Sequence, residues 1–234
     1  MNRLLSLFVV TALALVLVPT ARGQIVEITS AERNIAVDAD RMGPTSPHEN
    51  STTLGVFNRA VFDNSSVISA TASAGQNSEI TGSATGLRVS DSSGAHASGG
   101  TGTPPNGTDA INELFLDFTI TAPIPFSLDV TSMIQDGAPT GASHDQGSSI
   151  RLSRNGVVLF AFGGTSTAPI GPAGGSQSGT LLPGVYNLSL ETFVHNAGDA
   201  TREVTLTVGV IPEPASISLL LVAAGGMLAM RRKR

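Results

Sequence analysis

The 234-residue sequence contains no cysteine, no tryptophan and a single tyrosine. Without cysteine the chain forms no disulfide, no thiolate metal site and no thiol nucleophile. The shortage of aromatic rings argues against a lectin that stacks sugars on exposed aromatic side chains. Charged residues make up 13% of the chain, against about 25% in an average protein. Ser, Thr, Ala and Gly take their place, which is typical of turn-rich β domains.

Basic residues are also scarce outside the C-terminus. The one lysine is Lys233, and residues 24–214 contain seven arginines and 18 acidic residues, a formal charge of −11. The arginines are scattered and form no stripe that could neutralise successive phosphates, so nucleic acid is excluded as a partner. The negative charge also disfavours anionic glycans and membranes as direct ligands unless divalent cations bridge them.

Residues 1–23 have the order of a secretory signal peptide. Arg3 precedes the apolar stretch Leu4–Val18, and a short segment with Ala21 and Gly23 follows. This order predicts an N-terminal signal helix that signal peptidase removes by cleavage between Gly23 and Gln24. An amphipathic helix of a folded domain would need a polar face, which Leu4–Val18 lacks.

Residues 24–209 predict an all-β domain. Short apolar runs alternate with turn-forming residues, and no segment keeps the i, i+3, i+4, i+7 spacing of an amphipathic helix. The clearest signal is Asn155-Gly156, a pair suited to a type I′ hairpin turn. The expected strands are Ile25–Val37, Val56–Phe62, Val67–Thr71, Leu87–Ser90, Glu113–Ile120, Phe126–Val130, Ile150–Arg154, Val157–Phe162, Gly184–Leu190 and Glu203–Val208.

We expect these strands to form a single antiparallel two-sheet β-sandwich, jelly-roll-like or immunoglobulin-like, between the signal helix and a C-terminal transmembrane helix. Two long segments, Ser90–Asp109 and Gly163–Gly179, are rich in small residues and prolines and are predicted to be loops. Tyr186 alternates with leucines and is expected in the core. The carboxylates of Glu113, Asp117 and Asp129 alternate with apolar residues and are expected on a solvent face.

The chain ends in an apolar segment followed by cations. Ala215–Met230 is an uncharged run, and Arg231, Arg232, Lys233 and Arg234 follow it. As a helix this run would extend about 24 Å, so it spans a hydrocarbon core of about 30 Å only with local thinning. The terminal cations favour the cytoplasmic side, which places the residues before 215 outside. The signal peptide implies the same topology.

Residues 210–234 resemble the PEP-CTERM sorting domain of Gram-negative and related bacteria. The resemblance lies in Val210-Ile211-Pro212-Glu213-Pro214, the apolar span with Gly225-Gly226, and the terminal basic cluster. It implies that Pro212, Glu213 and Pro214 are recognised by an exosortase, an integral-membrane processing enzyme, and that cleavage near them releases the protein. Two prolines fix φ and hold Glu213 in an extended segment, which is compatible with such recognition.

Residues suited to catalysis or metal binding form no compact motif in the sequence. The four histidines, His48, His96, His144 and His195, are about 50 residues apart, so no local metal motif is present. Asp38-Ala39-Asp40 offers alternate carboxylates, and structural calcium stays an open alternative. No Gly-x-Ser-x-Gly elbow is present. We therefore assign no catalytic residue and no metal site, and we expect no enzyme activity.

The sequence thus predicts an exported structural protein of the bacterial cell surface or extracellular matrix, anchored transiently in the inner membrane. Signal peptidase and exosortase are its expected partners, and exopolysaccharide is a further candidate. The alternative is a non-catalytic module that binds polysaccharide or another surface protein. A matrix-processing hydrolase is a third reading, which needs an opposed pair of carboxylates that sequence alone does not identify.

Overall fold

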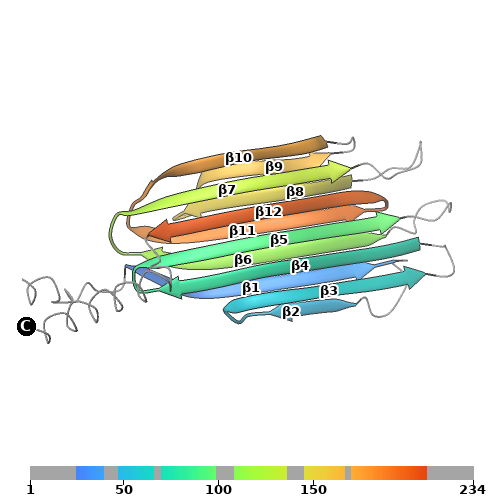
Figure 1. Cartoon of the computed structure of the whole chain (residues 1–234), viewed down its shortest axis with the longest axis horizontal. Helices are drawn as coiled ribbons and strands as arrows, with labels where there is room; N and C mark the ends of the chain where they lie inside the picture. The colour runs from blue at the N-terminus through green and yellow to red at the C-terminus, as the bar shows by residue number, and fades with distance from the viewer. Residues whose placement is uncertain are drawn as a thin grey trace, which may run out of the picture.

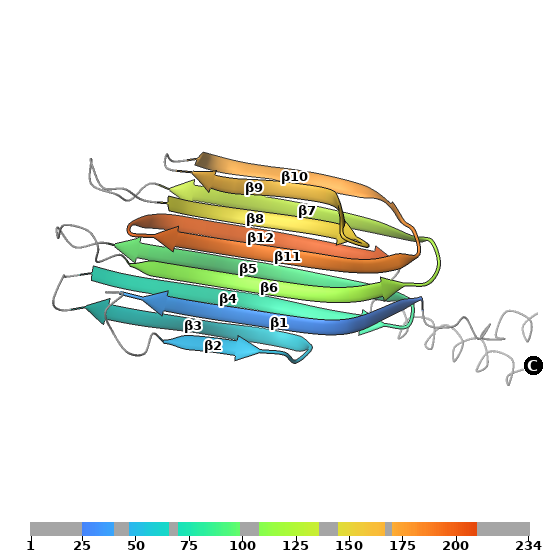
Figure 2. The ribbon, with the colours of Figure 1, turned by 180° about the vertical axis from the view of Figure 1, so that it is seen from behind.

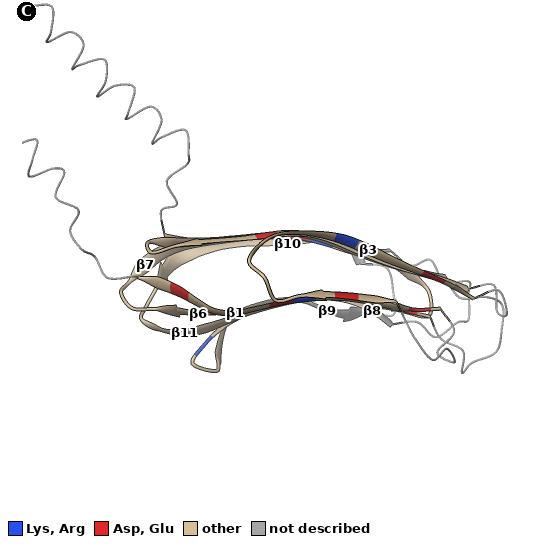
Figure 3. Cartoon of the chain, turned by 90° about the horizontal axis from the view of Figure 1, so that it is seen from below, with Lys and Arg blue, Asp and Glu red and all other residues tan. Residues whose placement is uncertain are grey.

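The structure is a computed structural model that describes residues 25–39, 47–65, 70–98, 108–135, 145–166 and 170–209. Within these residues the chain forms two antiparallel six-stranded sheets and no helix, which confirms the all-β, two-sheet prediction (Figure 1). The two sheets pack face to face as the layers of a sandwich (Figure 3). The predicted signal and transmembrane helices lie outside the described residues.

The two sheets share no strand, and each contains strands from early and late parts of the sequence. Sheet A has the order β2-β1-β6-β11-β8-β9, and sheet B has the order β10-β7-β12-β5-β4-β3. The strands are β1 Val26–Asp38, β2 His48–Ser51, β3 Gly55–Ser65, β4 Ala70–Ser83, β5 Gly86–Ser98, β6 Asp109–Ile120, β7 Ile124–Gln135, β8 Asp145–Arg154, β9 Val157–Ser166, β10 Ile170–Leu181, β11 Gly184–His195 and β12 Gly198–Gly209.

The two ends of the sandwich differ in their connections. The first and last strands meet at one end, because the Ile25 amide donates to the Ala84 carbonyl at 2.7 Å and Gly209 pairs with Gly86. We call this end the terminal pole; its connections are short, such as 84–85, 155–156 and 182–183. The longer connections, 39–47, 99–108 and 136–144, join strands at the opposite end, the loop pole (Figure 2).

The hairpin turn predicted at Asn155-Gly156 is confirmed. Both residues have positive φ, 48° and 80°, as a type I′ turn requires. Asn155 also fixes the neighbouring strand, because its Oδ1 accepts the Val185 amide at 3.0 Å and its own amide donates to the Val185 carbonyl at 2.8 Å. Tyr186 is fully buried as predicted, stacks on Phe118 and donates its hydroxyl to the Leu182 carbonyl at 2.6 Å.

The apolar core is divided into two clusters along the strands. The cluster toward the terminal pole contains large side chains such as Leu87, Leu116, Phe118 and Leu206. The cluster toward the loop pole is built mainly from alanines around Ile35, Val37, Phe57 and Val194; these alanines are Ala72, Ala74, Ala95, Ala97, Ala110 and Ala200. Smaller side chains allow closer sheets, and the two layers converge toward the loop pole in Figure 3. We call these regions the terminal half and the loop half.

Several boundaries predicted from the sequence are wrong. The segment Ser90–Asp109 is not one loop, because β5 continues to Ser98. The segment Gly163–Gly179 is largely strand, since β9 extends to Ser166 and β10 begins at Ile170. In both cases small polar residues occupy regular strand positions, where backbone pairing with a central neighbour compensates for their weak β propensity.

Some strands that follow each other directly in the sequence do not pair. β6 and β7, which contain the predicted strands Glu113–Ile120 and Phe126–Val130, lie in opposite sheets. The same holds for β11 and β12. Each short connection at these points crosses from one layer to the other instead of closing a hairpin. The carboxylates of Glu113, Asp117 and Asp129 lie on outer faces, as predicted.

Candidate functional site

A shallow groove runs along the outer face of sheet B. Three hollows of about 370, 620 and 470 Å³ follow one another along the strands, and each shares lining residues with the next. They cover four successive cross-strand rows, and rows two residues apart are separated by about 7 Å along the strands. The groove therefore extends over about 20 Å.

The four rows follow from the register of β3, β4, β5, β12 and β7. The row nearest the loop pole contains Phe62, Ser73, His96 and Asp199. Next come Ala60, Gly75, Gly94, Thr201, Met133, and then Asn58, Asn77, Ser92, Glu203, Thr131. The row nearest the terminal pole is Val56, Glu79, Ser90, Thr205, Asp129.

Two glycines form the floor of the groove at its centre. Gly75 and Gly94 lie directly opposite each other on β4 and β5, and neither has a positive φ. A Cβ built on either would have its nearest neighbour at 3.7 Å, an ordinary van der Waals contact. Neither backbone conformation nor packing requires glycine here, although glycine weakens a strand interior. The two glycines keep the floor low where larger side chains would fit.

The end of the groove near the loop pole combines an aromatic ring with a charged pair. Phe62 is 61% exposed on edge strand β3. Across the sheet, His96 Nδ1 and Asp199 Oδ1 are 2.6 Å apart, and both side chains are about half exposed. A flat apolar ring on one side and paired polar groups on the other are the contacts that a sugar ring uses: an apolar face and directed hydrogen bonds.

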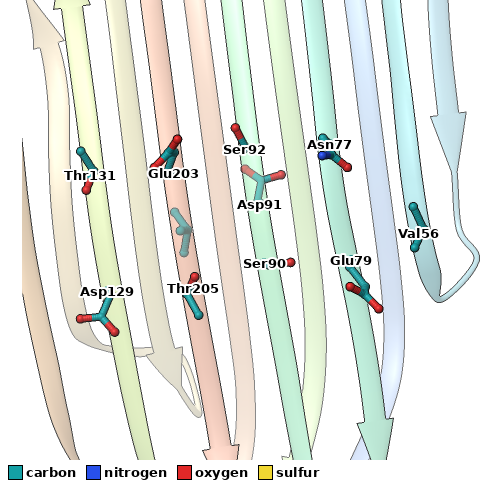
Figure 4. A pocket seen from close by; sticks show the side chains of 11 residues that line it. Val56, Asn77, Glu79, Ser90, Asp91, Ser92, Asp129, Thr131, Glu203 and Thr205 are labelled. Carbon is teal, nitrogen blue, oxygen red and sulfur yellow. The ribbon is translucent and has the colours of Figure 1, made fainter.

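The other end of the groove is lined by hydroxyl groups and by the exposed carboxylates of Glu79, Asp129 and Glu203, with the buried Asp91 beneath them (Figure 4). Glu203 lies between Thr131 and Ser92 in its row, and Asp129 accepts a hydrogen bond from Ser176 at 2.6 Å. Glu203 and Asp129 are diagonal neighbours on adjacent strands, a spacing of about 7–8 Å between Cα atoms. Groups of three or more His, Cys, Asp or Glu that could hold a metal ion are absent from the described part of the chain.

Beneath the groove, polar side chains cross the interior between the two core clusters. Arg202 donates from Nε and Nη2 to Asp91 Oδ2 at 3.0 and 2.8 Å, and both side chains are inaccessible to solvent. Gln76 donates to the other carboxylate oxygen at 2.7 Å. Ser93 and Thr192 join the two sheets through a 3.3 Å hydroxyl contact. We call this layer the polar belt; its further members are Arg33, Asn112, Ser132 and Ser148.

Arg33 supplies the second buried guanidinium of the polar belt, and no carboxylate of the described residues contacts it directly. It donates to the carbonyls of Thr53 and Gly55 at 2.7 and 2.8 Å and lies 5.6 Å from the centre of the Phe57 ring. Burial lowers the pKa of Arg33, and the negative charge of Asp91 partly offsets that effect. The arginine thus links β1 to the β2–β3 connection and to sheet B.

The histidines predicted as separate are not brought together as metal ligands in the described residues. His96 pairs with Asp199, and His195 pairs with Asp109 at 2.6 Å. His48 begins β2, and His144 lies outside the described residues. Of the candidate calcium stretch, Asp38 ends β1, the Ala39 amide donates to Asp63 at 2.9 Å, and Asp40 is outside the described residues.

The predicted sorting and processing residues all lie outside the described residues. They are Ala21, Gly23, Gln24, Pro212, Glu213, Pro214, Arg231, Arg232, Lys233 and Arg234. Among the residues that the structure does describe, no helix is long and apolar enough to cross a membrane.

The groove and the polar belt were not predicted from the sequence. A signal for the belt was present: Arg202 precedes Val204, Leu206 and Val208 at alternate positions, so strand periodicity places it in the core. The groove has no comparable signal, because its rows combine residues from five strands whose register was unknown.

No protein-family model matches the chain, and no curated protein sequence matches it significantly. Any assignment of function therefore depends on the residues themselves.

Proposed function

We propose that this chain is an exported, non-enzymatic structural protein of the bacterial cell surface or extracellular matrix, sorted by an exosortase. The supporting observation is that both ends of the folded domain lie at the terminal pole, where Ile25 and Gly209 contact the same turn, residues 84–86. The signal segment and the sorting tail would then both leave the domain at this pole. Strands of 12 or 13 residues would carry the loop pole about 40 Å away from the membrane.

The outer surface of sheet B is compatible with an extracellular location. Its outer face is built from short hydroxyl and amide side chains, with carboxylates spaced between them. Such a face stays hydrated and offers few long flexible side chains to order on contact. The domain also holds its two sheets together without disulfides, through the core clusters and the polar belt.

Intact-mass measurement tests the sorting proposal. The chain is expressed in a bacterium that has an exosortase, and the intact mass of the protein extracted from the cell surface is measured by mass spectrometry. We expect a product that begins at Gln24 and lacks residues 215–234. Glu213→Gln should leave the tail in place, whereas the control Glu203→Gln, an exposed strand glutamate, should be processed normally. A surface product that retains Arg234 would overturn the proposal.

A second candidate function is the binding of a neutral polysaccharide chain in the groove on sheet B. The observation that favours it is the glycine floor, since Gly75 and Gly94 keep the centre of the groove open at a cost in strand stability. The carboxylates Glu79, Asp129 and Glu203 line the groove, so an anionic chain would be repelled. A length of about 20 Å accommodates a short run of sugar units in an extended chain.

Glycan-array binding by the exported protein tests this second function. We expect neutral chains to bind and uronic-acid polymers not to bind. Gly94→Leu raises the floor and should abolish binding. The matched control, Ser189→Leu, places the same side chain on the outer face of sheet A and should leave binding unchanged. Equal binding by all three proteins would show that the groove is not the site.

A further inference from the structure

One lateral edge of the sandwich carries no charge. Between Arg154 and Glu191 the sequence contains no Asp, Glu, Lys, Arg or His. This stretch forms β9 and β10, which are the edge strands of sheet A and sheet B, respectively, on the same side of the molecule (Figures 1 and 2). The domain as a whole has a formal charge of −11, so this edge differs in charge from the rest of the domain.

The β9 strand has an apolar, partly exposed sequence. Its side chains Phe160 and Phe162 are partly buried against the core of the terminal half. The preceding residues Val157, Val158 and Leu159 are 66%, 42% and 49% exposed. β9 pairs with β8 on one side only, so half of its backbone amides and carbonyls point away from the sheet. An uncharged run of β-forming residues on an open edge is a template for pairing with another strand.

The opposite lateral edge has the features that prevent such pairing. β2 is only four residues long and carries His48 and Glu49. β3 is longer, but it carries Arg59 and Asp63. Short length and charged side chains are the usual protections of an edge strand. The second strand of the neutral edge, β10, is rich in glycine and contains Pro172, which cannot donate a hydrogen bond. Of these four edges, β9 is the one that has neither a charged side chain, nor a proline, nor a very short length; its irregularities are a β-bulge at Leu159 and the positive φ of Gly163.

We propose that β9 pairs with β9 of a second copy of this chain, antiparallel and about a twofold axis. This pairing joins two A sheets into one continuous sheet and satisfies the outward-facing backbone groups of both strands. The charge distribution of the domain favours a second copy of this chain as the partner of β9. Two domains of −11 repel each other over their acidic outer faces, where Glu113 and Glu191, for example, lie directly opposite one another on sheet A. At the β9 edge they meet without opposing carboxylates.

The pairing also removes apolar surface from water. Val157, Val158 and Leu159 would be covered in both copies at once, because a twofold interface buries the same patch twice. The interface is independent of the sorting tail and of the groove, which lies on the outer face of sheet B and not at this edge.

Single-cysteine cross-linking of the full chain tests the proposal without background, because the natural sequence has no cysteine. Leu159→Cys and Ala161→Cys place a thiol on β9, and Val56→Cys, at a position 70% exposed on β3, is the matched control. In membranes from expressing cells, a short bismaleimide should convert the β9 variants into covalent dimers and leave the control monomeric. Monofunctional maleimide labelling confirms that each thiol is reachable.

A charge introduced at the edge gives an independent readout. Adding Leu159→Lys to the Ala161→Cys chain should reduce cross-linking at least tenfold, whereas Val56→Lys in the same chain should not. Labelled but monomeric β9 variants, or dimers of the β3 control in equal yield, would overturn the proposal. Cross-linking that survives Leu159→Lys would also overturn it, because the lysines of the two copies would bring like charges into the paired edge.

Discussion

The two halves of this sandwich are made from the same strands but are packed in different ways. The terminal half contains leucines, isoleucines and a stacked pair, Phe118 and Tyr186, and its strands are joined by short turns. The loop half contains mainly alanines, and most of the longer connections start there. Apolar area buried per residue is therefore larger in the terminal half, and so is its hydrophobic stabilisation. The contrast shows that the two ends of one set of strands can contribute unequally to the stability of a fold.

The polar belt lies at the boundary between the halves. Several of its buried atoms, among them Arg202 Nη1, Gln76 Oε1 and Asn112 Oδ1, have no hydrogen-bond partner among the described residues. Unpartnered buried polar groups cost free energy, so the belt contributes less stability than an apolar layer of the same size. It does set the relative position of the sheets, because Asn112 of sheet A donates to the Gly94 carbonyl of sheet B at 2.7 Å.

Removal of the belt's carboxylate should have the largest effect. Asp91→Asn leaves the buried Arg202 without its charge partner, and we expect the free energy of unfolding to fall by about 3–5 kcal/mol. The control Asp129→Asn, on the outer face, should change it by less than about 1 kcal/mol. Urea unfolding followed by circular dichroism measures both. A loss below 1 kcal/mol for Asp91→Asn would mean that the polar belt does not couple the unfolding of the terminal half to that of the loop half.

A matched pair of isoleucines sharpens the comparison directly. Ile80 lies in the core of the terminal half and Ile35 in that of the loop half, and both are at most 1% exposed. Ile80→Ala should lower the free energy of unfolding by about 2–5 kcal/mol, the range for a large buried aliphatic. Ile35→Ala should mainly open the loop half, which already has less apolar area to hold it closed.

Hydrogen exchange separates these outcomes. In the Ile80→Ala variant we expect amides of both halves to exchange faster, because global unfolding becomes easier. In the Ile35→Ala variant we expect the acceleration to be at least tenfold larger in the loop half than in the terminal half. The same pattern of acceleration in both variants would break the distinction between a stable half and a locally opening one.

Ionisation of Tyr186 reports on the terminal half alone. Burial raises the pKa of Tyr186, with the positive charge of Arg154 acting in the opposite direction. An unfolded tyrosine ionises near pH 10. Above that pH the unfolded chain loses a proton that the folded chain keeps, so the free energy of unfolding falls as pH rises through the folded pKa.

The experiment is simple because Tyr186 is the only tyrosine and tryptophan is absent. Tyrosinate absorbance at alkaline pH should have a higher midpoint in the folded protein than in urea. Tyr186→Phe should remove this pH dependence and cost about 1 kcal/mol for the lost hydrogen bond. Identical midpoints in folded and unfolded protein would contradict the tight packing that we assign to this half.

The terminal half was also the part that sequence predicted best. Asn155-Gly156 and the alternation around Tyr186 are local signals, and turn chemistry and strand periodicity decide them within a few residues. The strands that were missed or truncated, β4, β5 and β10, alternate small residues such as Ala, Ser and Gly. Their two faces differ little in hydropathy, so the period of two is hard to recognise. Long-range register gives these segments their structure.

The same reason explains why no binding site was predicted. Phe62 and Asp199 are separated by most of the chain and share a row only because β3, β4, β5 and β12 pair in one register. The sequence does contain a signal for one member of the polar belt, because Arg202 alternates with Val204 and Leu206 and therefore lies on the core face of β12. An arginine at an inward position contradicts the usual expectation that charges lie outside, and its partner Asp91 is 111 residues away.

The smallest effect is expected at the loop pole. His96 and Asp199 form a close pair but are about half exposed, so solvent screens their interaction. Asp199→Asn should change the free energy of unfolding by less than about 1 kcal/mol, measured by urea unfolding in low salt. The same variant should weaken glycan binding if the groove is a site, because it removes a carboxylate acceptor at the open end. Stability unchanged with binding reduced would place function in the weakly packed half. Strong destabilisation would instead make this pair part of the scaffold and would erase the difference between the halves.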